Sequence, residues 1–466
     1  MQGICAQTWK WWPLSIDNTV HATDTITYHV YSAAFASSGE QVPFLLRANR
    51  QANISRSPYS GNISAGIVKK ATCPARWWDY DFAVQLTGRV GVKEVTGYFE
   101  QLYAHTRLWV VDFTAGIVPL VCGSQSPHWS SGSLLFSGNA HAVPHVSVGI
   151  NDYMPVPGLF GYVEIKGGLT HGWLDDQSVV RHTKLHHKFV GLRLGGSLPI
   201  TLAYQMHHAA QWGGYKGSLN YGNSWADWWN VVLSRSGGIT LSDQLNAQGN
   251  HIGFQELTLS CKGKGWKVDV YWQSIFEDMS ARFIGFGTNA ADGLLGVHIQ
   301  QTRWPFINRF TYELINTTSQ SGPIHDKDGL VFAGRDSYYL NSAYPQGWTY
   351  FSSIIGNPYL QTDNNRVRAH YMGLGGSVYG YHYRLLTSYV DNYGTYQRPL
   401  RTHNAALLLE VTTTIEKAWG LEVGLALAGD FGTQYGNQWG GSLRIAKSGI
   451  LAEYGRRDSL RKNTTM

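Results

Sequence analysis

Charged side chains are scarce in this chain. Asp, Glu, Lys and Arg make up 15% of its 466 residues, against roughly 25% in ordinary soluble domains. The net charge is only +6, and basic residues cluster only near the C-terminus, at Arg456, Arg457, Arg461 and Lys462. Nucleic-acid-binding proteins concentrate such residues in a patch. The composition therefore argues against a nucleic-acid partner.

Long apolar runs are also missing. A membrane-spanning helix needs about 20 consecutive apolar residues, and residues 113–122 form a short candidate that contains Gly116 and Pro119. The sequence therefore excludes a helical membrane protein.

Cysteines are few and widely spaced. The four of them, Cys5, Cys73, Cys122 and Cys261, form no C-x-x-C pair and fit no zinc-binding spacing. A disulfide between Cys73 and Cys122 is compatible with an oxidising compartment, but the spacing alone does not establish it.

Catalytic motifs are absent as well: the chain has no G-x-S-x-G, no phosphate-binding loop and no H-E-x-x-H. Several acids could form a carboxylate pair for glycoside cleavage, but sequence does not give the distance between carboxylates on which that chemistry depends. These acids are Asp175, Asp176, Glu277, Asp278 and Asp336. We predict no catalytic residue and no cofactor, and keep a surface hydrolase as a minor alternative.

Five histidines fall in two groups: His182, His186 and His187, then His207 and His208. The interval of four between His182 and His186 suits two metal ligands on a helix, but the surrounding residues lack helical periodicity. We therefore predict no metal site.

Aromatic residues and glycine, by contrast, are abundant, with 18 Trp, 27 Tyr, 17 Phe and 53 Gly, while the mean hydropathy is near neutral at −0.22. A transmembrane β-barrel has this composition, because it places aromatics in two interfacial girdles and alternates apolar and polar residues along each strand. A secreted all-β protein that binds sugar is the soluble alternative.

Alternation is clearest in residues 81–91. Phe82, Val84, Leu86 and Val90 share one face, while Gln85 and its polar neighbours take the other. Residues 142–150 and 161–169 repeat the pattern, after a Ser- and Gly-rich stretch at residues 130–139 that suits tight turns and close backbone approach.

Turn and loop lengths are uneven. Residues 417–420 form a tight turn, whereas residues 212–236 and 319–363 form long loops, the first with room for a short helix. Outer-membrane barrels combine short periplasmic turns with long extracellular loops in this way. At roughly 25 residues per strand and connection, the chain allows about 16 to 18 antiparallel strands.

We divide the chain into three parts. Residues 1–17 form a lead-in that resembles the end of a signal peptide, residues 18–454 form one barrel domain, and residues 455–466 form a polar tail. Residues 18–32 are expected to be a polar, extended entry to the barrel.

Loop aromatics are the candidate sugar-binding residues, because flat rings can stack on sugar rings and loops carry binding sites. Two nearby charges could bind sugar hydroxyls or acidic sugars. The full candidate set is Trp225, Trp228, Trp229, Arg335, Asp336, Tyr338, Trp348 and Tyr350.

Several strings resemble, in order, the Wzi-like capsule assembly family of Gram-negative outer membranes. They include SSGSLLFSGNAHAVPHVSVGINDYMPVP, GYVEIKGGLTHGWL, LHHKFVGLRLGG, WKVDVYWQSIFED, GRDSYYLNSAY and NNRVRAHYMGLGG. The resemblance covers about residues 42–376. It is weakest in the loop around Cys122, and the C-terminus lacks the terminal aromatic that is common in bacterial barrels.

The resemblance implies an 18-stranded barrel in the cell outer membrane that binds capsular polysaccharide in a lectin-like manner, with an occluded lumen and without catalysis. Its implied partners are surface polysaccharide, outer-membrane lipid and other outer-membrane proteins. A porin-like channel for oligosaccharides or small solutes, and a structural subunit of an outer-membrane complex, remain the alternatives.

Overall fold

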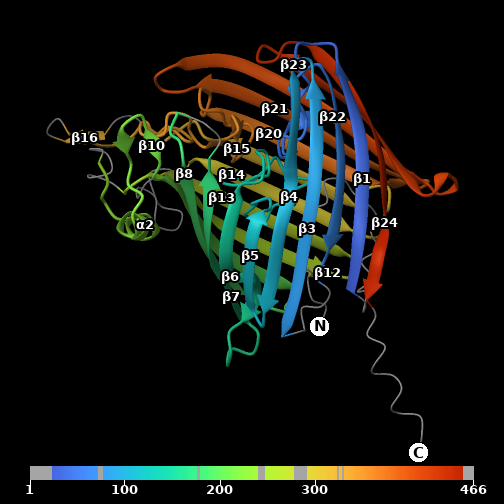
Figure 1. Cartoon of the computed structure of the whole chain (residues 1–466), viewed down its shortest axis with the longest axis horizontal. Coiled ribbons are helices and arrows are strands. Elements are labelled where there is room, and N and C mark those ends of the chain that lie inside the picture. Colours follow the sequence, from blue (N-terminus) through green and yellow to red (C-terminus); the bar gives the residue numbers. More distant parts are fainter. Residues whose placement is uncertain are drawn as a thin grey trace, which may run out of the picture.

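The computed structural model describes residues 24–71, 77–175, 179–239, 247–277, 291–322, 325–327 and 330–454. The expected lead-in of residues 1–17 and the polar tail of residues 455–466 lie outside the described residues. The described chain forms one closed antiparallel barrel of 18 strands (Figure 1).

In chain order the barrel strands are β1 (Asp24–Ser37), β2 (Tyr59–Lys69), β3 (Trp78–Gly91), β4 (Glu94–Leu108), β5 (Val111–Ile117), β6 (Pro144–Pro155), β7 (Val163–Leu174), β8 (Thr183–Leu194), β9 (Ile200–Trp212), β12 (Asn250–Gly263), β13 (Trp266–Glu277), β14 (Gly293–Gln301), β15 (Arg309–Asn316), β20 (Val367–Val378), β21 (Tyr381–Gly394), β22 (Pro399–Ile415), β23 (Leu421–Gly432) and β24 (Gln438–Tyr454).

Closure depends on β1, which pairs with β2 on one side and with β24 on the other. Val30, for example, lies opposite Ala65 of β2 and Lys447 of β24. Because every strand then has two neighbours, no edge of unpaired N–H and C=O groups remains, as a barrel in lipid requires. The predicted fold class and strand number are confirmed.

The two faces of the wall differ as the alternation predicts. On β3, Val84 and Leu86 are exposed on the outside, whereas Gln85 and Thr87 are buried on the inside. Inside, Gln85 and Thr87 donate hydrogen bonds of 2.8 and 2.7 Å to Glu100 of β4. The outer face is thus an apolar surface for lipid, and the inner face is a polar network.

Connections at the two ends of the barrel differ in length. At the end where β1 begins and β24 ends, residues 264–265, 379–380 and 416–420 make short turns, the last with a 3-10 helix at Glu416–Ala418. At the opposite end, residues 38–58, 118–143, 213–249 and 317–366 make long connections. The predicted asymmetry is confirmed, and the long connections mark the extracellular side.

Short elements lie within these long connections. They are α1 (Phe44–Arg47), β10 (Tyr215–Lys216), β11 (Leu219–Asn220), α2 (Trp225–Val232), β16 (His325–Lys327), β17 (Leu330–Ala333), β18 (Thr349–Tyr350) and β19 (Ser353–Ile354). The short helix expected in residues 212–236 is therefore present as α2. None of the helices in the described part of the chain is long and apolar enough to cross a membrane.

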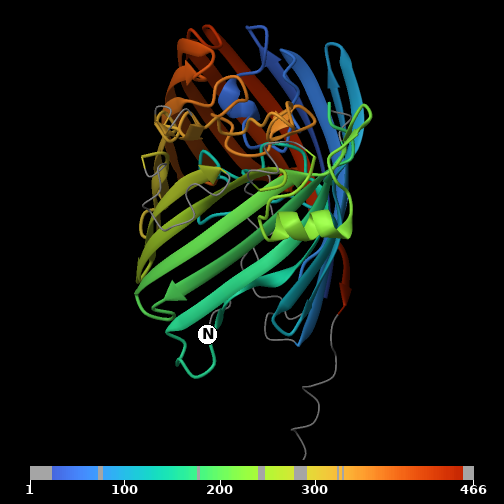
Figure 2. The same ribbon diagram turned by 90° about the vertical axis from the view of Figure 1, so that its left-hand side faces the viewer.

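Three of the long connections fold into the barrel instead of extending away from it, and α1 is visible within the wall (Figure 2). We call the described parts of residues 38–58, 118–143 and 317–366 the plug. Its Leu134, Phe136 and Trp348 are at most 1% exposed and belong to one apolar core with inward-facing wall residues such as Phe254 and Leu294. Removal of this apolar surface from water holds the plug inside.

Glycine allows the plug to pack this closely. Gly132 has a φ of +105°, and a Cβ there would lie 2.7 Å from the Cβ of Ser137 and 2.9 Å from Oδ1 of Asn49. The close backbone approach predicted for residues 130–139 is therefore found inside the barrel.

Candidate functional site

Buried acids of the barrel wall hold the plug. Glu313 of β15 accepts hydrogen bonds from Ser130 Oγ at 2.7 Å, from the backbone N–H of Ser131 at 2.6 Å and from the hydroxyl of Tyr271 at 2.5 Å. A carboxylate on the wall thereby satisfies polar groups of the plug that are buried away from water.

Glu256 of β12 has the same arrangement. It accepts hydrogen bonds from the backbone N–H of Ser124 in the plug at 3.1 Å and from Nε2 of Gln273 on the neighbouring strand at 2.8 Å. Asp430 of β23 likewise accepts from the backbone N–H of Phe44, the first residue of α1, at 2.9 Å. Each of the two plug segments outside residues 317–366 is therefore tied to the wall by at least one acid.

The third connection, residues 317–366, is held by Asp292. Its carboxylate accepts hydrogen bonds from the backbone N–H of Ser319 at 3.0 Å and of Gln320 at 2.5 Å, and from the hydroxyl of Tyr338 at 2.8 Å. Acids thus anchor all parts of the plug.

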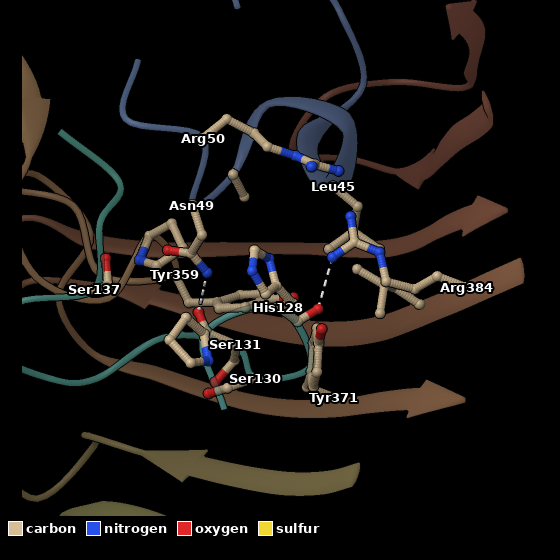
Figure 3. Close-up of a pocket in the computed structure, with 14 residues that line it drawn as sticks. Leu45, Asn49, Arg50, His128, Ser130, Ser131, Ser137, Tyr359, Tyr371 and Arg384 are labelled. Carbon is tan, nitrogen blue, oxygen red and sulfur yellow. Dashed lines mark hydrogen bonds between the residues drawn. The ribbon is translucent and has the colours of Figure 1, made fainter. Parts of the chain in front are cut away.

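An arginine from the plug and one from the wall share a single carboxylate. Glu410 of β22 pairs with Arg50 of the plug at 2.6 Å and accepts from Nε of Arg384 on β21 at 2.5 Å. Arg384 also donates from Nη1 to the backbone oxygen of His128 at 2.6 Å (Figure 3). Burial, and then the positive charges of Arg384 and Arg50, lower the pKa of His128 to about 3, so its imidazole is neutral at physiological pH.

A cavity beside these residues has a volume of ≈ 30 Å³ and is lined by Asn49, His128, Tyr359 and Tyr371 among others (Figure 3). That space holds about two water molecules. It does not hold a sugar ring, so this cavity is not where a polysaccharide would bind.

The extracellular mouth carries a different group of residues. The guanidinium carbon of Arg366 lies 3.9 Å from the centre of the Tyr396 ring, and that of Arg335 lies 5.7 Å from it. The Tyr396 hydroxyl donates to the backbone oxygen of Ser319 at 2.9 Å, which ties the β21–β22 loop to the plug. We call Arg335, Arg366 and Tyr396 the arginine–tyrosine cluster.

Part of this cluster remains available to a ligand. Arg366 donates from Nε and Nη2 to the backbone oxygen of Thr318, at 3.2 Å in each case, and Arg335 is exposed. Within the described residues, neither guanidinium forms an ion pair with a carboxylate. Both therefore keep N–H donors for an acidic ligand.

The candidate aromatics of this connection face inward. Tyr338 and Trp348 are fully buried, Tyr350 is nearly so, and Asp336 accepts a hydrogen bond from Ser321. The Trp348 indole donates to the backbone oxygen of Leu135 at 2.9 Å. These aromatics present no ring face to solvent here, because removing an apolar ring from water into the plug stabilises the folded protein. Their proposed contact with sugar stays a prediction without support from their positions.

The three candidate tryptophans of α2 lie together, far from the plug. The helix packs on the outer face of the wall, as Figure 2 shows, with Trp228 half-buried and Trp225 and Trp229 exposed. The structure therefore divides the predicted set into Arg335 and Asp336 at the mouth, three aromatics in the plug and three tryptophans outside the barrel.

Sequence reasoning missed Arg366 and Tyr396. Each residue lies next to the end of a strand rather than in the middle of a long loop. They come close to Arg335 only because β20 begins and β21 ends at the mouth. The R-V-R string at the start of β20 and the single tyrosine of the β21–β22 connection were the available signals.

Histidines and cysteines have structural positions. In the described part of the chain, no group of three or more His, Cys, Asp or Glu could hold a metal ion. Cys122 is a free, buried thiol 3.5 Å from Ser133 Oγ. Cys73 itself lies outside the described residues.

The fold and the plug define a class: a closed outer-membrane-type barrel whose lumen is filled by its own loops. The sequence model of the family described as capsule assembly protein Wzi matches residues 26–429. The chain therefore belongs to the Wzi capsule assembly family, and with its lipid-facing barrel it is a protein of the cell outer membrane.

One solved structure in particular shares the fold. Wzi from Escherichia coli, an outer membrane protein involved in group 1 capsule assembly and a carbohydrate-binding β-barrel, superposes with a TM-score of 0.60 at 14% identity, over 90% of this chain and 84% of that one. OccD3 from Pseudomonas aeruginosa is less similar, with a TM-score of 0.47 at 10% identity over 92% of both chains. A search among curated proteins found no match.

Proposed function

We propose that this protein binds capsular polysaccharide at its extracellular mouth and retains the polymer at the cell surface as a non-catalytic scaffold. The observation that carries the proposal is the arginine–tyrosine cluster: two guanidinium groups beside one ring, held at the mouth of a plugged barrel. Family membership supports it, since the family is described by its part in capsule assembly.

The chemistry of the cluster suits an acidic polysaccharide. A guanidinium group donates paired hydrogen bonds to a carboxylate and single ones to hydroxyls. One such contact is weak, but a polymer offers the same sugar at every repeat, so a dissociated unit is replaced by its neighbour before the chain leaves. Weak binding at one site therefore still retains a long polymer.

The test compares cell-attached with shed polysaccharide in a deletion strain that carries wild-type or variant protein. The double variant Arg335→Gln, Arg366→Gln should move polymer from the cells into the medium without changing the total amount. The matched control is Arg303→Gln, because Arg303 also lies near an aromatic ring, 5.7 Å from Trp304, but in a turn at the opposite, periplasmic end.

Each outcome has a distinct meaning. If the double variant retains polymer as well as wild type while the deletion strain sheds it, the cluster is not the binding site. If the deletion strain itself sheds nothing, the scaffold function is wrong, and pull-down of partner proteins would then test the alternative of a structural subunit.

The porin alternative has no comparable support. The apolar core of the plug and its anchors to wall acids fill the barrel interior at the level of Leu134 and Trp348. Planar-bilayer recordings should accordingly give almost no steady ion conductance, and a large steady conductance would favour a channel.

A further inference from the structure

Helix α2 lies on the outer face of the barrel. On β8, Val190 and Leu192 are exposed to the membrane, so Lys184, His186 and Lys188, which have the same parity, also point outward. His186 contacts the ring of Trp228, with centroids 6.5 Å apart, and Lys188 donates from Nζ to the backbone oxygen of Val232 at the end of α2. The helix therefore covers the wall directly above the lipid-facing residues of β8.

The inner side of α2 is fixed to this wall. Val231 packs with Ala210 and Trp212 of β9, and Trp228 lies against the same cluster. At the start of the helix, Ser224 Oγ accepts from the backbone N–H of Asp227, and the Asp227 carboxylate accepts from the backbone N–H of Ser224 at 2.9 Å. This capping box and the apolar contacts define which side of α2 faces away from the barrel.

The side that faces away is apolar. Trp225, Trp229 and Leu233 follow one another at intervals of four residues, so they form one stripe along the helix. They are 79%, 53% and 49% exposed. In water such a stripe would be unfavourable, because it leaves three large apolar side chains without cover.

The position of the stripe indicates which environment it contacts. The apolar outer surface of the barrel includes Val190 and Leu192 of β8. Toward the extracellular end of this strand α2 covers the wall, and the stripe on α2 continues the apolar surface there. Tryptophan is favoured at this depth of a bilayer, since its ring is apolar and its N–H can reach polar headgroups. An amphipathic helix with its apolar side toward lipid lies in the membrane interface.

We propose that α2 is an interfacial helix that inserts Trp225, Trp229 and Leu233 into the outer leaflet of the membrane that the barrel spans. The occupant of this surface is membrane lipid rather than polysaccharide. The helix thereby sets the depth of the barrel and places the arginine–tyrosine cluster outside the lipid. This inference does not depend on the proposed polymer site.

The experiment uses an environment-sensitive fluorophore on a single engineered cysteine in the full-length protein. In the parent variant, Cys5, Cys73 and Cys261 are replaced by Ser and the buried Cys122 is kept. Labelling of this parent, which has no engineered cysteine, measures the background signal. The protein is reconstituted in vesicles that contain lipid with a spin label near the headgroup, which quenches a fluorophore only on close approach.

Three positions are compared: Trp229→Cys on the stripe, Val190→Cys on the exposed outer face of β8 and Phe351→Cys on an exposed residue of the plug. We expect spin-labelled lipid to quench the label at position 229 as strongly as the one at 190, and to leave the one at 351 unchanged. Ala226→Cys, at an exposed position of α2, is a second reporter that removes no tryptophan.

Two results would overturn the proposal. A label at 229 and at 226 that behaves like the one at 351 means that the helix lies in water. A label at 229 that lipid does not quench, but whose emission shifts when acidic capsular polysaccharide is added, assigns the tryptophans to the polymer.

Discussion

The backbone N–H of Ser131 donates a 2.6 Å hydrogen bond to the carboxylate of Glu313, two residues 182 positions apart in the chain. One belongs to the plug and the other to the inner face of β15. The pair illustrates how this protein closes its lumen: wall acids replace the water that buried plug groups would otherwise bind.

Loss of the Glu313 charge should loosen the plug. In Glu313→Gln the charge-assisted hydrogen bonds to Ser130 and Ser131 become neutral ones, which should lower the free energy of unfolding by about 2 kcal/mol. Planar-bilayer recordings should show brief openings that wild type lacks. The control is Glu422→Gln, since Glu422 pairs with Arg444 at 2.6 Å within the wall and should leave conductance unchanged. Equal conductance in the two variants would contradict this role of Glu313.

Trp348 and Trp225 should respond differently to truncation. Trp348→Ala removes a fully buried ring and should cost about 3–5 kcal/mol of stability, because a cavity remains in the plug. Trp225→Ala removes an exposed ring and should change stability in detergent by no more than about 0.5 kcal/mol. Thermal unfolding followed by circular dichroism measures the stability of both variants. Similar losses of stability would contradict the placement of Trp348 in the core of the plug and of Trp225 on the surface.

Acid should release the plug. Burial and the nearby Arg384 and Arg50 lower the pKa of His128 to about 3, and burial and Arg89 lower the pKa of His141 to about 4. The unfolded chain takes up these protons near pH 6.5 and the folded plug only at lower pH, so stability falls as the pH drops from about 6.5 toward 3.

Protease sensitivity of the plug against pH measures this effect. The double variant His128→Gln, His141→Gln should show a flatter profile than wild type over that range, because its side chains do not titrate. Identical profiles would mean that other groups, such as the wall acids, govern the response to acid.

Polymer binding should weaken with salt. Guanidinium groups that solvent reaches attract carboxylates over about one Debye length, which falls from about 10 Å at 0.1 M to about 3 Å at 1 M ionic strength. Affinity of the purified protein for an acidic capsular polymer should therefore drop over that range in wild type and change little in the Arg335→Gln, Arg366→Gln variant. Salt-independent binding by wild type would exclude an electrostatic site.

Some elements were predictable and others were not. Alternation at residues 81–91 identified β3 directly, because the period of a strand is local. Residues 18–32 are expected to be a polar, extended entry, yet from Asp24 onward they belong to β1, the strand that closes the barrel. Their partners in β24 lie more than 400 positions away, so the local sequence of β1 carries little information about the pairing.

The candidate site residues likewise include some whose exposure was predictable from the sequence and some whose burial was not. The sequence pointed to Arg335, Trp225 and Trp229, and these three residues are exposed. It also pointed to Trp348, whose burial depends on three connections meeting inside the wall. A tryptophan in a loop has the same local sequence whether it faces water or the core.

Composition and alternation by themselves thus favoured a membrane barrel of about 16 to 18 strands with unequal ends, since they depend on intervals of two residues and on totals, and the family resemblance implied 18 strands. Tertiary structure alone decided that the long connections turn inward, that wall acids hold them and that Arg335, Arg366 and Tyr396 meet at the mouth. Those outcomes depend on contacts between residues far apart in sequence, which become neighbours only when the barrel has closed.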